Sequence, residues 1–119
     1  KDKDARATLE PLIKETDILI EQFRPGVMSR LGLDYETVRK IRPDIVYCSI
    51  TGYGQHGPKS AIAGHDLNYI ADTGLLSLSF GNTGKTVVPP ALVADIGGGT
   101  MPSVINILLA LLRKNASGE

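Results

Sequence analysis

Two short apolar runs constrain the fold of this chain more than any other feature of its sequence. One is DILIEQF at residues 17–23, and the other is IVYCSI at residues 45–50. Continuous apolar runs with β-branched residues are typical of strands that are buried on both faces, as in a parallel sheet. We therefore predict two buried strands.

The segment between these runs has the character of a helical crossover. PGVMSRLGL provides a turn and about one helical turn, and Asp34 is placed to N-cap a helix over YETVRKI that ends before Pro43. A strand, a helical crossover and a second strand form a βαβ unit, whose strands run parallel. The predicted fold class is α/β, and ligands are expected outside the carboxyl ends of the strands, at residues 21–24 and 50–54.

Two segments outside the βαβ unit have the apolar spacing of amphipathic helices. The first covers about residues 3–15, and its apolar positions are Ala5, Leu9, Leu12 and Ile13. The second is GHDLNYIADTGLL, which is typical of a helix start, and its predicted inner face is Leu67, Ile70 and Ala71. The chain has no internal repeat, so we expect one domain or a piece of one.

A further helix is predicted from Met101 to Lys114. Thr100 is the expected N-cap, and Pro102 falls in the first turn, where its missing N–H costs nothing. The residues expected to face the core are Ile105, Leu108, Leu109 and Leu112.

Charge and cysteine content limit the class of protein. Lys and Arg number 13 and Asp and Glu number 13, so no global field attracts nucleic acid or an anionic membrane. The single cysteine, Cys48, lies in an apolar run and cannot form an internal disulfide. No apolar run reaches the ~18 residues typical of a membrane span. We therefore expect a soluble, cytoplasmic protein without a nucleic-acid or membrane partner.

The first candidate site follows the first predicted strand and contains Gln22, Phe23, Arg24 and Arg30. Two guanidinium groups at this spacing could clamp phosphates through bidentate hydrogen bonds. The alternative is a pair of solvated surface arginines, which spacing alone favours.

The second candidate site is the pair His65 and Asp66 in GHDLNY. A neutral imidazole can take or give a proton near pH 7 with little penalty. The alternative is that Asp66 is a first-turn helix acid favoured by the helix dipole, and that His65 is a polar neighbour.

The third candidate is Asp95 in ADIGGG, between an apolar run and a helix. Glycines allow a ligand close to the backbone, and a helix start offers N–H donors to developing negative charge. Asp95 could accept a proton or act as a nucleophile, and the alternative is a structural turn aspartate.

Other chemistries find little support in the sequence. The loop TGYGQHGP is not a phosphate-binding P-loop, and His56 within it is expected to be a solvated loop residue. There is no Cys and His cluster for a metal, and no convincing Ser, His and Asp order for acyl-serine chemistry.

The long segment DILIEQFRPGVMSRLGLDYETVRKIRPDIVYCSITGYGQHGP, with AGHDLNYIADTGLL and LVADIGGGTMPSVINILLALL, closely resembles the family III CoA-transferases. This family is also called the carnitine dehydratase and bile-acid-inducible protein family. GHDLNY is similar to the α-methylacyl-CoA racemase branch and is the most specific motif, whereas FRPG and SRLG are general to the family. The resemblance covers nearly the whole chain.

The resemblance implies roles for individual residues. His65 falls on the racemase base for one face of the α-carbon, and Asp95 falls on the acid or base for the other. QFR with Arg30 resembles part of a CoA cradle. The positions that the resemblance places along the acyl-CoA site, besides His65, are Gly64, Asp66, Leu67, Asn68 and Tyr69.

The resemblance also implies an architecture. Residues 1–119 correspond to the central fragment of a Rossmann-like large domain, in proteins that form interlinked homodimers and use a CoA thioester as substrate, with no separate cofactor. In the racemase branch a glutamate beyond this segment partners the histidine. The fragment alone is therefore expected to be inactive.

Three functions follow as alternatives. A racemase that interconverts 2-methylacyl-CoA enantiomers needs both His65 and Asp95. A CoA-transferase needs Asp95 as the nucleophile that forms an acyl-aspartyl anhydride, and not His65. A non-catalytic CoA-binding fragment needs neither.

Overall fold

The computed structural model describes residues 5–118, and a two-stranded parallel sheet organises the first part of the fold. Strand β1 (Ile18–Glu21) pairs with β2 (Val46–Ser49) in the register Ile18 to Val46 through Glu21 to Ser49. Both strands lie within the apolar runs that predicted them, and the predicted parallel crossover is confirmed. The predicted α/β class is confirmed. A two-stranded sheet does not by itself establish a Rossmann-like fold.

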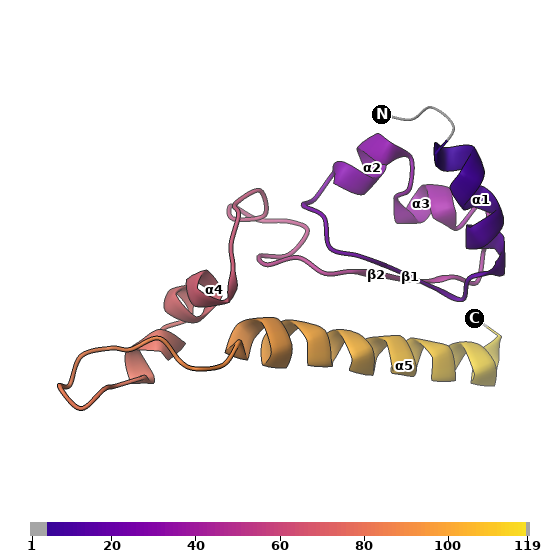
Figure 1. The fold of residues 1–119 in the computed structure, drawn as a ribbon. Coiled ribbons are helices and arrows are strands. Elements are labelled where there is room, and N and C mark those ends of the chain that lie inside the picture. Colours follow the sequence, from indigo (N-terminus) through magenta and orange to yellow (C-terminus); the bar gives the residue numbers. More distant parts are fainter. Residues whose placement is uncertain (1–4, 119) are drawn as a thin grey trace.

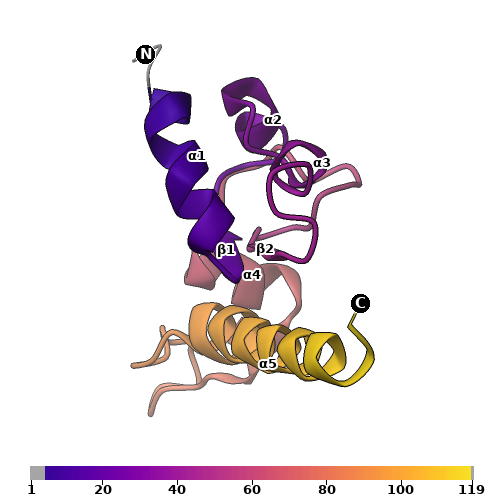
Figure 2. The same ribbon diagram turned by 90° about the vertical axis from the view of Figure 1, so that its right-hand side faces the viewer.

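Helices lie on both sides of this sheet (Figures 1 and 2). On one side are α1 (Ala5–Glu15), α2 (Val27–Leu31) and α3 (Tyr35–Val38), and on the other is α5 (Met101–Ser117). Asp34 caps α3 as predicted, since its Oδ1 accepts the Thr37 N–H at 2.9 Å. That helix ends at Val38, earlier than predicted. The first two residues of the helix predicted over 3–15 lie outside the described residues.

The core is small and sits between α1, α3 and the sheet. It is built on Ile13, Val38 and Ile45. Leu19 and Tyr47, which pair across the strands, lie against it from the sheet. Tyr47 also donates its hydroxyl hydrogen to the Leu33 carbonyl at 2.8 Å, and burial raises the pKa of Tyr47 to about 12.

A cluster of charges holds the end of α5 to the segments that precede the two strands. Lys114 Nζ lies 2.8 Å from Asp44 Oδ2 and 3.2 Å from Asp17 Oδ1, and Arg42 contacts both carboxylates. The hydrogen bond to Asp44 raises the pKa of Lys114. Asp17 directly precedes β1, and Asp44 lies just before β2. The cluster therefore fixes the end of α5 against the starts of both strands.

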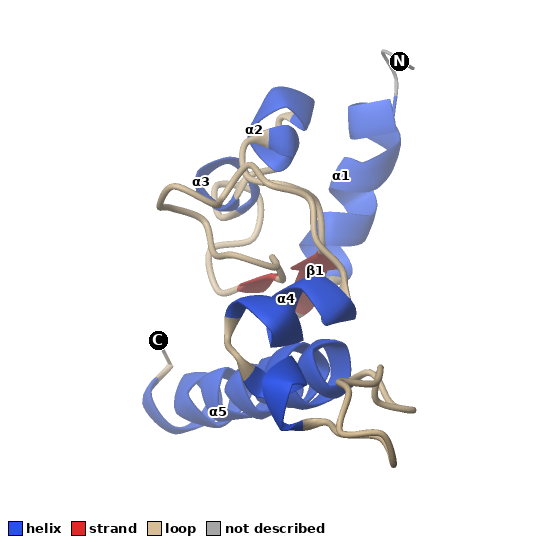
Figure 3. Cartoon of the chain, turned by 90° about the vertical axis from the view of Figure 1, so that its left-hand side faces the viewer, coloured by secondary structure: helices blue, strands red, loops and turns tan. Residues whose placement is uncertain are grey.

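The rest of the chain forms three short helical elements. These are α4 (Asp66–Asp72), the 3-10 helix η1 (Leu75–Leu78) and the π-helix η2 (Val93–Thr100), which runs directly into α5. Helix α4 lies across the start of this joined helix (Figure 3). Between η1 and η2, a loop carries an isolated antiparallel bridge between Phe80 and Thr86.

Helix α5 begins at Met101, as predicted, but the capping role expected of Thr100 was wrong. Thr100 has helical angles and makes no side-chain cap, because η2 has already begun at Val93. The glycines of ADIGGG therefore lie inside a helix rather than in a loop. Pro102 still falls in the first turn of α5, as expected.

Several residues predicted to face the core are exposed instead. They are Leu67 and Ala71 of α4, and Ile105, Leu108, Leu109 and Leu112 of α5. Helix α5 meets the sheet along one edge, where Ile107 is buried, so its wider apolar face has no neighbour among residues 5–118. The strands, which were predicted to be buried on both faces, are also partly uncovered. Ile20 of β1 is 57% exposed.

The joined helix Val93–Ser117 is long and apolar enough to cross a membrane by length and composition. The expectation that no apolar run is long enough for a membrane span did not include this helix, because Asp95 and the glycines interrupt the run. A single helix of this kind is weak support for a membrane span, because core helices of soluble proteins can have the same length and composition.

The described chain is extended. Its radius of gyration is 18.1 Å, against the ~13.5 Å expected of a compact domain of this length. An elongated chain with a small core leaves much apolar surface uncovered.

We predict that the core depends strongly on Ile13. Replacing this buried side chain in Ile13→Ala should reduce the unfolding free energy by about 2–5 kcal/mol, because it leaves a cavity beneath the sheet. The neighbour Leu12 is 59% exposed, so Leu12→Ala should change the unfolding free energy by less than about 0.5 kcal/mol. Urea unfolding of both variants measures the difference, and equal losses would contradict the assigned core.

Candidate functional site

A cleft opens where the carboxyl ends of both strands meet α4 and η2. Its volume is about 680 Å³. The strand ends contribute Gln22, Phe23, Arg24, Ile50, Thr51, Gly52 and Tyr53, and the later elements contribute Gly64, His65, Tyr69, Asp95, Gly98 and Gly99. The expectation that a ligand site would form outside the strand ends agrees with this placement.

Glu21 fixes the turn of the chain out of β1. This carboxylate is buried, and its Oε2 accepts the Phe23 N–H at 2.7 Å. Its backbone carbonyl accepts the Ile50 N–H at 2.9 Å, which extends the strand pairing to the cleft. Gln22, Phe23 and Arg24 are therefore held at the mouth of the cleft by one buried side chain.

His65 occupies the N-cap of α4 with extended backbone angles. Its backbone N–H donates to Asn68 Oδ1 at 3.0 Å, and its carbonyl accepts the Asn68 N–H at 2.9 Å. These bonds fix the backbone from which the imidazole projects. The side chain is exposed and lines the cleft.

Asp95 lies in the first turn of η2, also exposed and lining the cleft. Its backbone N–H donates to Asp66 Oδ1 at 2.7 Å, and its carbonyl accepts the Thr100 hydroxyl at 3.0 Å. The histidine and the aspartate thus reach one cleft from two different helices.

Two tyrosines form the wall between the loop after β2 and α4. The Tyr53 and Tyr69 rings meet edge to face with centroids 5.1 Å apart, and Tyr69 donates its hydroxyl hydrogen to the Gly64 carbonyl at 2.7 Å. A Cβ on Gly64 would lie 2.6 Å from Tyr69 Cε1, and one on Gly52 would overlap the Tyr69 hydroxyl. Both positions therefore require glycine.

The same wall is held from outside by a charged contact. Tyr53 donates to Asp72 Oδ2 at 2.7 Å, and Lys59 Nζ lies 2.8 Å from the same oxygen. The hydrogen bonds from Lys59 and Tyr53 lower the pKa of Asp72, and the bond to Asp72 raises the pKa of Tyr53. Helix α4 is thereby attached to the loop after β2.

The cleft gathers most of the sequence-predicted site residues. Those that line it are Gln22, Phe23, Arg24, Gly64, His65, Tyr69 and Asp95. Those outside its lining are Arg30, Asp66, Leu67 and Asn68. Asp66 and Asn68 instead bond to the backbones of Asp95 and His65.

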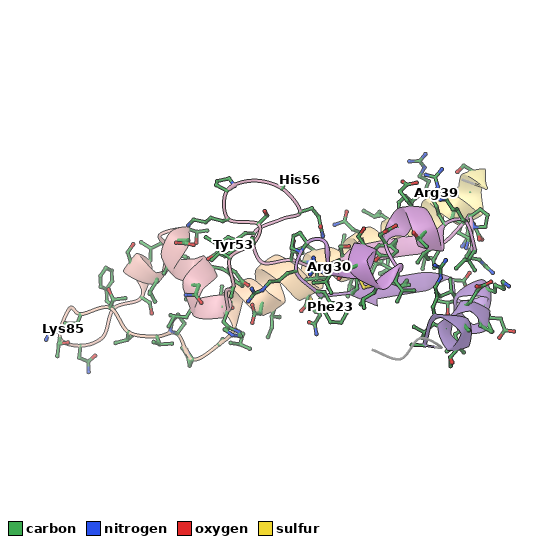
Figure 4. All side chains as sticks on the ribbon, turned by 90° about the horizontal axis from the view of Figure 1, so that it is seen from above. Phe23, Arg30, Arg39, Tyr53, His56 and Lys85 are labelled. Atoms are coloured by element: carbon green, nitrogen blue, oxygen red, sulfur yellow. The ribbon has the colours of Figure 1, made fainter. Side chains whose placement is uncertain are left out.

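Arg30 does not line the cleft, but its guanidinium lies close to Gly26, near the mouth of the cleft. Its Nη1 is 3.3 Å from the position of a Cβ on Gly26, and the adjacent Pro25 lines the cleft. Figure 4 labels Arg30 on α2 together with Phe23 and Tyr53, and shows His56 out on the loop after β2. His56 is exposed, as expected.

Sequence reasoning missed part of the cleft wall. Ser60 lies beyond the loop TGYGQHGP and was given no role, and Thr100 was expected only as a helix N-cap; both line the cleft. Tyr53 falls within residues 50–54, where the rule for ligand sites in α/β sheets predicted a ligand, although no role was given to its side chain.

Comparisons with known proteins agree on one family. The family described as CoA-transferase family III matches residues 1–119. The chain is 41% identical over 112 residues to the α-methylacyl-CoA racemase of Mus musculus, covering 93% of this chain and 29% of that protein. It is 35% identical over 119 residues to the succinyl-CoA:glutarate CoA-transferase of Homo sapiens, covering 100% of this chain and 27% of the relative.

The fold is also similar to solved structures. A CAIB/BAIF family protein from Brucella suis superposes with a TM-score of 0.86 at 34% identity, over 99% of this chain and 31% of that one. The chain therefore spans about three tenths of the length of such relatives.

We predict an acid-sensitive contact between α4 and the loop after β2. Because the folded-state pKa of Asp72 is lowered, its contribution to stability is complete above the unfolded value near 3.8 and is lost as pH falls through the folded value. The melting temperatures of the native chain and Asp72→Asn should differ at pH 7 and converge below that pKa. A difference that persists undiminished at the acid end would contradict this role.

Proposed function

The chain belongs to CoA-transferase family III, and from that premise we propose that the whole protein interconverts the (R) and (S) enantiomers of a 2-methylacyl-CoA thioester. The observation that carries the proposal is the presence of His65 and Asp95 on one cleft. A single proton-transfer group returns a proton to the face it came from, whereas two groups from different elements serve both faces.

The chemistry requires both groups. The α-proton of a thioester is weakly acidic, so its removal needs a positioned base and stabilisation of the enolate oxygen. In one direction His65 takes the proton from the α-carbon and Asp95 delivers a proton to the opposite face, and in the other direction the roles are exchanged. A positioned acid or base is commonly worth about 10²–10⁴-fold in rate.

The strand ends suit the CoA part of the substrate. Arg24 lines the cleft and Arg30 lies near its mouth, so two guanidinium groups are available to the phosphates of CoA. Phe23 is 51% exposed and offers an apolar face next to them. We propose these three residues, with Gln22, as part of the CoA cradle, and the thioester as the substrate with no separate cofactor.

A second candidate function is CoA transfer. Asp95 is exposed in the cleft, where its carboxylate could attack an acyl-CoA to form an acyl-aspartyl anhydride and release the CoA thiolate. Relatives that bear transferase names match the whole chain, which supports this alternative. The mechanism assigns no role to His65, so the imidazole in the cleft favours racemisation.

The assembly and location remain proposals. We propose that the whole protein is a cytoplasmic, interlinked homodimer, which would cover apolar residues such as Leu108 and Leu112 on α5. The non-catalytic alternative predicts CoA binding that persists without His65 and Asp95.

We predict that wild-type full-length protein exchanges the C2 hydrogen of 2-methyldecanoyl-CoA with D₂O and loses the optical purity of either enantiomer. His65→Ala and Asp95→Asn should each abolish racemisation. Each variant should still exchange the C2 hydrogen of one enantiomer, the one whose proton the remaining base removes. Deuterium at C2, followed by NMR, measures this.

Racemisation that survives both substitutions would contradict the two-base assignment. Absence of exchange from the intact protein would remove the racemase proposal. The transferase alternative would then be tested by trapping an acyl group on Asp95.

We also predict that Gly98 keeps the cleft wide enough for its ligand. A Cβ on Gly98 meets nothing within 4 Å, and this residue lines the cleft. Gly98→Val should therefore fold and raise KM for the thioester several-fold. Gly97 has equally open surroundings in the same π-helix but does not line the cleft, so Gly97→Val is the matched control. Equal effects of both variants would contradict the prediction.

A further inference from the structure

Asp66 is a buried charge whose burial the proposed reaction does not explain. Among residues 5–118, the buried charged side chains are Glu21 and Asp66, at 8% and 6% exposure. A buried carboxylate loses its hydration and must be hydrogen-bonded to persist in the fold. Each of these two accepts a 2.7 Å bond from a backbone N–H of a cleft residue, Phe23 for Glu21 and Asp95 for Asp66.

The bond made by Asp66 satisfies a donor at the start of a helix. The first N–H groups of a helix have no partner within it, and Asp95 lies in the first turn of η2. The N-cap residue Leu92 provides no side-chain bond. The Asp66 carboxylate, which comes from α4, takes the place of the missing cap and carries the negative charge that a helix N-terminus favours.

The same bond joins the two proposed proton-transfer groups. Asp66 directly follows His65 at the start of α4, and it holds the backbone of Asp95 at the start of η2. This hydrogen bond, together with the packing of α4 against η2, therefore sets the separation of the imidazole from the Asp95 carboxylate. On the basis of the proposed racemase function, we infer that Asp66 is a positioning residue that holds Asp95 in place opposite His65.

Asn68 provides the matched comparison. Its Oδ1 accepts the His65 N–H at 3.0 Å, so it fixes the backbone of the histidine as Asp66 fixes that of the aspartate. Both residues lie in the first turn of α4, and neither lines the cleft. Replacing Asp66 should therefore disturb Asp95 and spare His65, and replacing Asn68 should disturb His65 and spare Asp95.

The experiment uses full-length protein and each enantiomer of 2-methyldecanoyl-CoA in D₂O. His65→Ala and Asp95→Asn first assign which enantiomer depends on which base. Exchange at C2 is then measured for Asp66→Ala, Asp66→Asn and Asn68→Ala, together with backbone amide exchange around Asp95 by mass spectrometry. Asp66→Asn keeps an acceptor oxygen, and Asp66→Leu fills the space without one if the alanine variant fails to fold.

Asp66→Ala should reduce Asp95-dependent exchange by on the order of 10- to 100-fold, because a small misplacement of a reacting group has effects of this size. His65-dependent exchange should keep most of its rate, and amide exchange at Asp95 should accelerate. Asp66→Asn should rescue both properties. Asn68→Ala should show the opposite preference between the enantiomers.

Equal losses for both enantiomers in Asp66→Ala, or unchanged amide exchange at Asp95, would overturn the inference. Failure of both Asp66→Ala and Asp66→Leu to fold would also overturn it, by showing a general structural role. If wild-type protein exchanges neither enantiomer, the racemase proposal fails by itself. Amide exchange at Asp95 then decides the positioning inference alone. Faster exchange in Asp66→Ala, restored to the native rate in Asp66→Asn, would support it.

Discussion

The parallel pairing of β1 with β2 determines where the site opens. In the register from Ile18 with Val46 to Glu21 with Ser49, both strands end at the same edge, so residues that follow them must meet there. The Ile50 N–H continues the ladder to the Glu21 carbonyl. An antiparallel pairing would put the segment after Glu21 and the segment after Ser49 at opposite edges, and the cleft would not form.

Hydrogen bonds from backbone N–H groups to buried carboxylates turn this edge into a defined site. Glu21 holds the backbone of Phe23, and Asp66 holds that of Asp95. Burying such groups is costly unless they are bonded, so each is a strong constraint on the local backbone once its bond forms. The side chains that face the cleft can then remain exposed and available to a ligand while their backbones are fixed from behind.

The sequence predicted the features that depend on local patterns. The two strands, the Asp34 cap and the start of α4 at His65 follow from apolar runs and capping chemistry, and the structure confirms them. The π-helix could not be predicted from such patterns, because Gly97 and Gly98 disfavour a helix by about 1 kcal/mol each relative to alanine. Packing of α4 against η2 and the hydrogen bond from the Asp95 N–H to Asp66 outweigh that preference. The exposed face of α5 was misassigned because helical spacing identifies an apolar face but not the presence of a neighbour.

Under the proposed function, the α-carbon of a CoA thioester binds between His65 and Asp95 in the cleft beyond the strand ends. The most direct test is a crystal structure of the full-length protein with a non-reactive 2-methylacyl-CoA analogue. The account predicts the His65 imidazole and the Asp95 carboxylate on opposite faces of the α-carbon, each within hydrogen-bonding reach of where its proton would be, with the CoA phosphates toward Arg24 and Arg30. An analogue whose α-carbon lies against Asp95 alone, with His65 turned away, would contradict the account.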